Sequence, residues 1–320
     1  MDTIIAINDF VNNIVWGAPT LLLIIGTSLF LTYKLGFVQF KNIGFLIHKT
    51  IVEPFRKDEK KSGAGDVTSF QAAMMSVSGI VGSGNIAGVA TAIMLGGPGA
   101  VLWMNLAALI GMATKFSEIA LGLHYRKVNP DGTVSGGPMY YLSEGLGKRW
   151  VGMLYAVLAV CMSFVISPFV DTNVMVTTLN ESFNIPILYS GIFFAILTGM
   201  VIFGGFSRIG RVAEFVAPFM GGGYILAGIV IIILNITRVP AAFVEIIQAA
   251  FDPAAITGGV VGSMLISMRY GMARGLLSNE AGLGTAAMVH SAAKVKHPIE
   301  QAVWGPVEVF LDTTLVCSVS

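Results

Sequence analysis

Charged residues are scarce in this sequence: Lys, Arg, Asp and Glu together make up 12% of its 320 residues, whereas about a quarter is usual for soluble domains. Apolar residues reach 55%, and the mean hydropathy is +0.78. So little charge predicts that lipid surrounds most of the chain. The net charge of +1 leaves no concentrated basic footprint, so nucleic acid is excluded as a partner.

Cysteine and histidine are also few. Cys161 and Cys317 both lie in apolar runs, where free cysteine behaves as a small buried hydrophobe, so neither a disulfide nor a structural metal site is expected. The metalloprotease motif His-Glu-x-x-His is absent. A membrane serine enzyme would need a histidine at membrane depth, whereas all four histidines are expected near one interface. We therefore predict no enzyme activity and no cofactor. The histidines are His48, His124, His290 and His297.

Most of the sequence consists of long apolar runs. A membrane helix needs roughly 20 apolar residues to cross a hydrocarbon core about 30 Å thick. The first run is not read as a cleavable signal peptide, because Asp2 and Asp9 precede it in place of a basic segment. An all-α, multi-pass membrane bundle is therefore expected. Its predicted spans are a leading helix at 10–33 and seven more at about 68–95, 97–124, 150–178, 186–204, 212–236, 257–289 and 302–320.

Lysine and arginine are distributed unevenly between the two sets of alternate loops. Cytoplasmic loops carry the excess of these residues, so we expect the N-terminus outside the cell and the segment 34–67 in the cytoplasm. The mixed-charge run 56–61 is expected to be a solvated loop. Lys115, Arg269 and Arg274 fall inside spans. The predicted cytoplasmic loops hold Lys34, Lys41, Lys49, Arg56, Lys57, Lys60, Lys61, Arg126, Lys127, Lys148, Arg149, Arg208, Arg211, Lys294 and Lys296, against Arg238 alone on the other side.

Two of the predicted spans have glycine-rich centres. The span at 68–95 would be about 42 Å long as a continuous helix at 1.5 Å per residue, which exceeds the hydrocarbon core. Its segment 78–88 holds four glycines, and each weakens a helix by about 1 kcal/mol relative to alanine. The span at 257–289 has a similar segment at 271–284. Both patterns predict a helix that breaks within the membrane.

The glycine spacing also has other interpretations. Gly84, Gly88 and Ala92 have the spacing of a small-residue packing face. The pattern G-x-G-x-x-x-G differs from the dinucleotide motif, and no strand precedes it, so nucleotide binding is excluded. The topology favours the break: Asn-x-Ala-Gly occurs in both segments, at Asn85 and Asn279, and the charge count makes the two helices antiparallel. Two antiparallel broken helices are typical of inverted-repeat transporters with a site at the midplane.

A broken membrane helix predicts a specific chemistry. Its unwound turn leaves N–H and C=O groups that lipid cannot satisfy. The half-helix N-termini are partly positive and suit a carboxylate, while freed carbonyls and neutral side-chain oxygens suit a dehydrated sodium ion. Ser83, Gly84 and Asn85 offer such groups in the first break, and Ser278 and Asn279 offer them in the second.

At these segments the sequence resembles the alanine/glycine:cation symporters, from about residue 16 to its end. The resemblance implies the fold of the bacterial leucine transporter, a known example of inverted repeats, with ten core helices in two inverted sets of five. Within one transmembrane domain, 1–320, this implies the leading helix at 10–33, a first repeat at 68–236 and a second beginning at 257–320. Because the family continues through about three more helices, the second repeat is expected to be truncated. The matching stretches are GSGNIAGVA at 82–90, GGPGA at 96–100, GGPMYY at 136–141 and SNEAGLG at 278–284.

The resemblance also implies roles for individual residues. The backbone amides of Ser83 and Gly84 would hold the substrate carboxylate, and the Asn85 side chain would ligate sodium beside it. Main-chain carbonyls of Ser78 and Val81 would face a second sodium site. The residues implied to line the pocket from the second broken helix are Leu277, Ser278 and Asn279.

Ionisable residues inside the spans each need a reason, because an isolated charge at mid-bilayer costs roughly 2.5–3.5 kcal/mol. Lys115 and Glu118 lie three positions apart on one helical face, so mutual neutralisation is expected, with a role in a cytoplasmic gate as the alternative. Arg274 and Glu280 lie close to the second break. They are expected either to pair across the gate or, in the case of the arginine, to snorkel to the interface.

Two further polar sites complete the candidates. Asp312 and Thr313 place a carboxylate beside a hydroxyl in the last span, which predicts a sodium ligand or a proton acceptor, with a structural hydrogen bond as the alternative. Gln71, just before the first break, is polar enough to reach the pocket.

The function these features predict is sodium-coupled symport of a small neutral amino acid, such as alanine or glycine, into the cell. A proton-coupled carrier is an alternative, and a passive channel is less favoured because the chain has no repeated filter loop. Expected partners are the amino acid, Na⁺ and the lipid of a bacterial or archaeal inner membrane. Glycine, L-alanine, D-alanine and serine all stay open as substrates, as does the oligomeric state.

Overall fold

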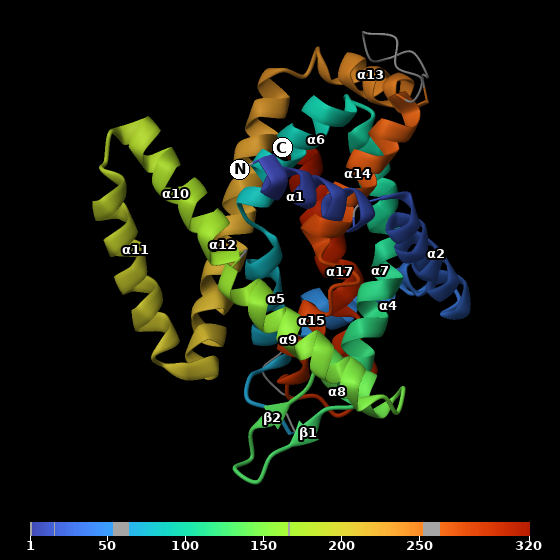
Figure 1. Ribbon diagram of the computed structural model, residues 1–320, viewed down its shortest axis with the longest axis vertical. Helices are drawn as coiled ribbons and strands as arrows, with labels where there is room; N and C mark the ends of the chain where they lie inside the picture. The colour runs from blue at the N-terminus through green and yellow to red at the C-terminus, as the bar shows by residue number, and fades with distance from the viewer. Residues whose placement is uncertain (1, 16, 54–63, 166, 252–262) are drawn as a thin grey trace.

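The computed structural model is almost entirely helical over the residues it describes, which confirms the all-α prediction (Figure 1). One small antiparallel hairpin joins β1 (Lys127–Val128) to β2 (Val134–Ser135). The described residues are 2–15, 17–53, 64–165, 167–251 and 263–320, so the mixed-charge run 56–61 lies outside them. The helices are α1 (Asp2–Val15), α2 (Ala18–Lys34), α3 (Val38–Lys41), α4 (Ile43–Ile47), η1 (His48–Val52), α5 (Ser69–Ile80), η3 (Gly84–Gly88), α6 (Val89–Gly96), α7 (Ala100–His124), α8 (Pro138–Glu144), α9 (Arg149–Val165), α10 (Ser167–Phe183), α11 (Ile187–Ile202), α12 (Gly205–Leu234), α13 (Val239–Phe251), α14 (Ser263–Asn279), α15 (Thr285–Ser291), α16 (Pro298–Ala302), α17 (Trp304–Val309) and η4 (Phe310–Cys317).

Helix length separates the spans that the sequence predicts into two groups. By length and composition, three stretches within the described ranges are long and apolar enough to cross a membrane: α7, α12, and α9 taken together with α10 on either side of residue 166, which is not described. A fourth results if α5 and its bent continuation through α6 count as one span. The other predicted spans are shorter or interrupted helices. Figure 1 shows α10 and α11 as a pair that stands away from the remaining helices.

Several helix boundaries differ from the prediction. The chain bends at Gly17, and α2 begins afterwards with Pro19 in its first turn, so the leading helix at 10–33 is divided. Proline fits the first turn of a helix but interrupts its interior. The last span, 302–320, begins at the end of α16 and continues through α17 and η4, with an interruption at Val303. The helix α13 was not predicted, because its segment was read as part of a connection between spans.

The first broken helix is interrupted where the glycines predict. Thr68 and Gln71 form a reciprocal capping box at its start, with hydrogen bonds of 3.0 and 3.1 Å. The helix α5 ends at Ile80, and Val81 is extended with φ −82° and ψ 107°. The chain resumes in η3, a π-helix of the kind found at functional sites, and the two halves are bent by 50°.

The second break lies later in its glycine-rich segment than its centre. The helix α14 continues to Asn279, and the interruption follows at 280–284. Glu280, Gly282 and Gly284 have φ values of +54°, +100° and +78°, a region that continuous α-helix excludes. The asparagine therefore ends the first half of this helix, just as Asn85 begins the second part of the other broken helix.

Two earlier glycines of that segment, Gly271 and Gly275, pack helices together and do not break one. A Cβ on Gly275 would lie 2.7 Å from the carbonyl oxygen of Met104 in α7, and a Cβ on Gly271 would collide with Ala100. Glycine at these positions lets α14 approach α7 closely. These two glycines, four residues apart, therefore have the kind of packing role that the sequence analysis considered for Gly84, Gly88 and Ala92.

The two broken helices run in opposite directions, as the charge count predicts. Val67, just before α5, forms a parallel bridge with Ala293, just after α15. At the other end Gly99, just after α6, packs against Ala250 at the end of α13. The guanidinium of Arg126 donates to the Ala293 carbonyl at 2.7 Å, which places the β1–β2 hairpin at the first end (bottom of Figure 1). Loops predicted to be cytoplasmic therefore meet at one end.

The helix α7 forms the centre of the bundle. Its small residues Ala107, Ala108 and Ala113 are fully buried, as expected where helices pack closely. Gly305, at the start of α17, makes a similar close contact, because an added Cβ would lie 2.8 Å from the backbone nitrogen of Phe116. This approach brings α17 directly beside Lys115.

Candidate functional site

A buried cluster of polar side chains joins the first break to the end of α14 and to the last helix. The Asn85 carboxamide donates to Asp312 Oδ1 at 2.6 Å and lies 3.2 Å from Ser278 Oγ. Ser278 and Thr313 each donate from their hydroxyls to Asp312 Oδ2 at 2.8 Å. None of the four residues is more than 4% exposed. Candidates from three distant parts of the sequence, Asn85, Ser278 and the pair Asp312–Thr313, are thus brought into direct contact.

At each break, the side chain of one asparagine accepts a hydrogen bond from a nearby backbone amide and also contacts the last helix. Asn85 Oδ1 accepts a hydrogen bond from the Gly82 amide at 2.8 Å, which satisfies a donor freed by the unwound turn. Asn279 Oδ1 accepts from the Ala281 amide at 3.0 Å, while its Nδ2 lies 3.3 Å from Thr313 Oγ1. The repeated Asn-x-Ala-Gly pattern therefore marks structurally comparable positions.

The cluster offers oxygens that a small hard cation prefers, those of a carboxylate and two hydroxyls, while the carboxamide oxygen of Asn85 is bonded to the Gly82 amide. A hydroxyl is both donor and acceptor, so Ser278 and Thr313 can rotate from donating to Asp312 to presenting a lone pair to a cation. Asp312 supplies one formal negative charge among neutral ligands. The charge of the arrangement therefore fits a monovalent cation.

The turn before Asn85 is more open. Ser83 and Gly84 are partly exposed, and the Ser83 hydroxyl donates to Asp171 Oδ1 of α10 at 2.7 Å. A Cβ on Gly84 or Gly88 would collide with the guanidinium of Arg274. The glycine face of the first broken helix therefore accommodates the arginine of the second.

Four other candidates do not reach the cluster. The Ser78 side chain is exposed and donates to the Met75 carbonyl at 2.8 Å, and Leu277 is 42% exposed. The role expected of Val81 involves only its main-chain carbonyl, and its side chain is buried. Gln71 was expected near the pocket. Its amide instead donates to a carboxylate oxygen of Glu214 in α12 at 2.9 Å, while its carbonyl completes the capping box.

The ion pair expected between Lys115 and Glu118 is not formed. Lys115 Nζ lies 3.3 Å from Glu308 Oε2, because the close approach of α17 supplies a nearer carboxylate than its own helix does. The carboxylate of Glu118 lies instead beside the backbone amides of Gly282 and Gly284 in the second break. A role for either residue at a gate stays a prediction.

The pairing expected between Arg274 and Glu280 is likewise not among the ion pairs of the described residues. The carboxylate of Glu280 accepts a hydrogen bond from the Thr285 hydroxyl, across the turn that the two residues span. Arg274 points toward the other broken helix, where its guanidinium covers Gly84 and Gly88. The helix break itself separates the two side chains.

The sequence analysis missed a second buried polar group. Glu308 Oε1 lies 2.7 Å from His290 Nε2, and its Oε2 accepts from the Ser76 hydroxyl at 2.7 Å. Both ionisable side chains are fully buried, although His290 was expected near an interface. Glu308 stands in an apolar run, and an ionisable residue within a span is by itself a functional signal. That signal was available in the sequence.

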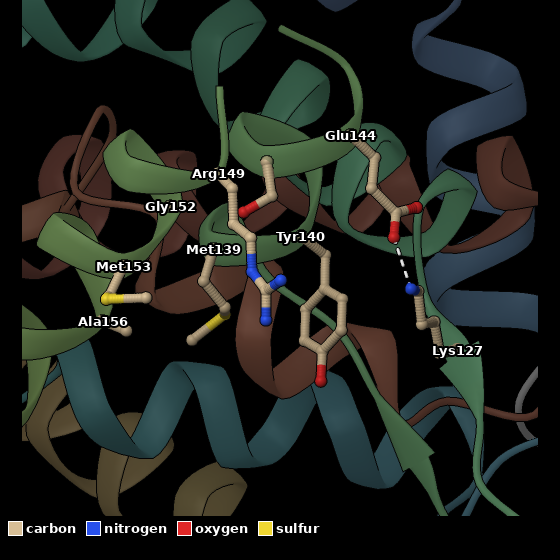
Figure 2. A pocket seen from close by; sticks show the side chains of 9 residues that line it. Lys127, Met139, Tyr140, Glu144, Arg149, Gly152, Met153 and Ala156 are labelled. Carbon is tan, nitrogen blue, oxygen red and sulfur yellow. Dashed lines mark ion pairs between the residues drawn. The ribbon is translucent and has the colours of Figure 1, made fainter. Parts of the chain in front are cut away.

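A pocket of about 620 Å³ opens near the hairpin end, between β1, α8 and α9 (Figure 2). Figure 2 shows the guanidinium of Arg149 between Met139 and Tyr140. Lys127 and Glu144 form an exposed ion pair of 2.5 Å at its rim, and the hydrogen bond that the ammonium donates to this carboxylate raises the pKa of the lysine. No candidate site residue lines this pocket, so it is separate from the buried cluster.

Comparisons with known proteins identify similar sequences along the whole chain. The family model described as the sodium:alanine symporter family matches residues 1–320. An uncharacterized transporter of Haemophilus influenzae is 42% identical over 320 residues, which cover 99% of this chain and 69% of that protein. The sodium/alanine symporter AgcS of Methanococcus maripaludis is 40% identical, over 100% of this chain and 70% of that protein. The amino-acid carrier protein AlsT of Bacillus subtilis is 38% identical, over 92% of this chain and 61% of that protein.

Proposed function

This chain belongs to the sodium:alanine symporter family, and from that premise we propose that it carries alanine or glycine into the cell together with Na⁺. Members of this family are symporters, so the prediction of a membrane transporter without enzyme activity is confirmed. The choice of substrate and of coupling ion belongs to the proposal. It is supported by the relative from Methanococcus maripaludis, which is named a sodium/alanine symporter.

The observation that carries the proposal is the 2.6 Å contact between Asn85, in the first break, and Asp312 in the last helix. We assign one sodium ion to this cluster, with Ser278 and Thr313 as further ligands. A second ion is assigned to the main-chain carbonyls of Ser78 and Val81, on the family resemblance alone.

The substrate is assigned to the open turn next to that ion. The amides of Ser83 and Gly84 would bind its carboxylate at the start of η3, where unpaired backbone N–H groups favour an anion. Leu277, Ser278 and Asn279 would form the opposite wall. Sodium beside the carboxylate would offset its negative charge at short range.

Transport would follow from movement of the two broken helices against the surrounding bundle. The proposed repeats are 68–236 and 257–320, with the N-terminus outside and the hairpin end in the cytoplasm, as the distribution of lysine and arginine favours. One sodium charge crossing 100 mV contributes about 2.3 kcal/mol, which corresponds to roughly fortyfold accumulation of a neutral zwitterion.

Uptake into proteoliposomes that contain the full-length protein tests this function. An inward sodium gradient is expected to drive concentrative, saturable uptake of labelled alanine or glycine, accelerated by an inside-negative potential. A potassium gradient of equal size should give none. Uptake driven by a proton gradient without sodium would replace the sodium proposal with the proton-coupled alternative. Non-saturable flux without counterflow exchange would contradict carrier function and indicate a channel.

A further inference from the structure

The end of α14 depends on a side chain from another helix. Asn279 is the last residue of α14, and the last carbonyls of a helix have no partner within it. Lys115 Nζ, from the centre of α7, donates to the Asn279 carbonyl oxygen at 2.8 Å. The lysine thus supplies both a hydrogen-bond donor and a positive charge at the negative end of the helix dipole. It fixes the residue whose side chain contacts Thr313.

The lysine is in turn held by the second buried polar group. Its Nζ lies 3.3 Å from Glu308 Oε2, and the same oxygen accepts from Ser76 in α5. The other oxygen of Glu308 contacts His290 Nε2 in α15. Lys115, Glu308 and His290 are all fully buried. Contacts from α5, α7 and α15 therefore hold the carboxylate in one position, and the carboxylate in turn holds the lysine.

The contacts continue to the start of the first broken helix. His290 Nδ1 lies 2.7 Å from Gln301 Nε2 in α16, and that amide lies 3.1 Å from the Ser69 carbonyl oxygen in the first turn of α5. Trp304 Nε1 donates to the Ser69 hydroxyl at 3.1 Å. An unbroken series of polar contacts therefore leads from the cluster around Asp312 to the first turn of α5, at the end of that helix away from the break.

We propose that Lys115, Glu308 and His290 form a positioning network that sets the sodium affinity of the cluster by fixing Asn279. The proposal rests on the sodium site assigned above. Charges buried this completely are costly to desolvate, and replacing such a pair with apolar residues is often neutral or favourable for stability alone. The network also ends on a backbone carbonyl next to the proposed ligands, which a purely stabilising ion pair would not need to contact.

The test compares how alanine uptake depends on sodium concentration in the full-length protein and in Lys115→Met. The sodium half-saturation concentration is expected to rise at least about tenfold, since partners that orient ion ligands typically change affinity 10–100-fold. Lys115→Arg, which keeps a charge and a donor, should shift it less. The double variant Lys115→Met/Glu308→Gln removes the unpaired carboxylate, so it should recover protein yield but not sodium affinity.

The control is Lys127→Met/Glu144→Gln, which removes the exposed pair at the hairpin end and should leave the sodium dependence unchanged. A wild-type half-saturation concentration in Lys115→Met, or full recovery of sodium affinity in the double variant, would show that the network only stabilises the fold. Uptake by the wild-type protein that ignores sodium would instead refute the proposed function, so the two failures are distinguishable.

Discussion

Replacing Asp312 with asparagine is expected to raise the sodium half-saturation concentration of alanine uptake at least about a hundredfold. The substitution keeps the size of the side chain, but it replaces one acceptor oxygen with an NH2 donor and removes the one formal negative charge among the proposed ligands. A unit charge 4 Å from a cation contributes about 4 kcal/mol at an effective dielectric constant of 20, and each 1.4 kcal/mol is a tenfold change in affinity. The measurement is initial uptake rate against sodium concentration.

The control for this substitution is Asp131→Asn. Asp131 is exposed in the turn of the hairpin, where its carboxylate accepts hydrogen bonds from Thr133. Its removal should leave the sodium curve in place. If Asp312→Asn also keeps the wild-type curve, then Asp312 is a structural hydrogen-bond acceptor for Asn85 and Ser278, and the sodium site must be elsewhere.

Asn85→Leu is expected to abolish uptake and to destabilise the protein. Leucine has similar volume but cannot ligate a cation. It leaves one buried oxygen of Asp312 without a partner and removes the acceptor of the Gly82 amide, whose hydrogen bond is partly buried. An unsatisfied buried group costs about 1–3 kcal/mol, and more when it is charged. Sodium should therefore raise the melting temperature of the wild-type protein, as a ligand of the native state does, but not that of this variant.

Asn235→Leu provides the matched control. Asn235 is exposed just after α12, where its amide donates to the carbonyl of Ile231 in the last turn. Uptake and the sodium-induced shift in melting temperature should both survive this change. Retention of either property in Asn85→Leu would exclude this asparagine from the ion site.

Much of the fold follows from patterns that act locally. The break after Ile80 is predictable because four glycines weaken one stretch of helix and Asn85 can satisfy the freed Gly82 amide. The antiparallel course of the broken helices follows from the charges of the loops. The polar character of the buried cluster is predictable too, since Asp312 and Thr313 are polar neighbours in an apolar span.

The features that could not be predicted are contacts between residues on different helices, which depend on distance in space. Lys115 has Glu118 on its own helical face, and only the close approach of α17 at Gly305 brings Glu308 nearer. Spacing along one helix cannot reveal a partner on another. Gly275 shows the same limit, because composition alone does not distinguish a glycine that breaks a helix from one that admits a neighbour.

The most direct test of the central claim is equilibrium binding of labelled alanine to the purified full-length protein, in sodium and in potassium at equal ionic strength. The account predicts that sodium lowers the Kd for alanine, and that alanine lowers the Kd for sodium by the same factor, because coupling between two sites is reciprocal. Asp312→Asn should lose this coupling. An alanine Kd that is identical in sodium and potassium would contradict a shared site at the two helix breaks.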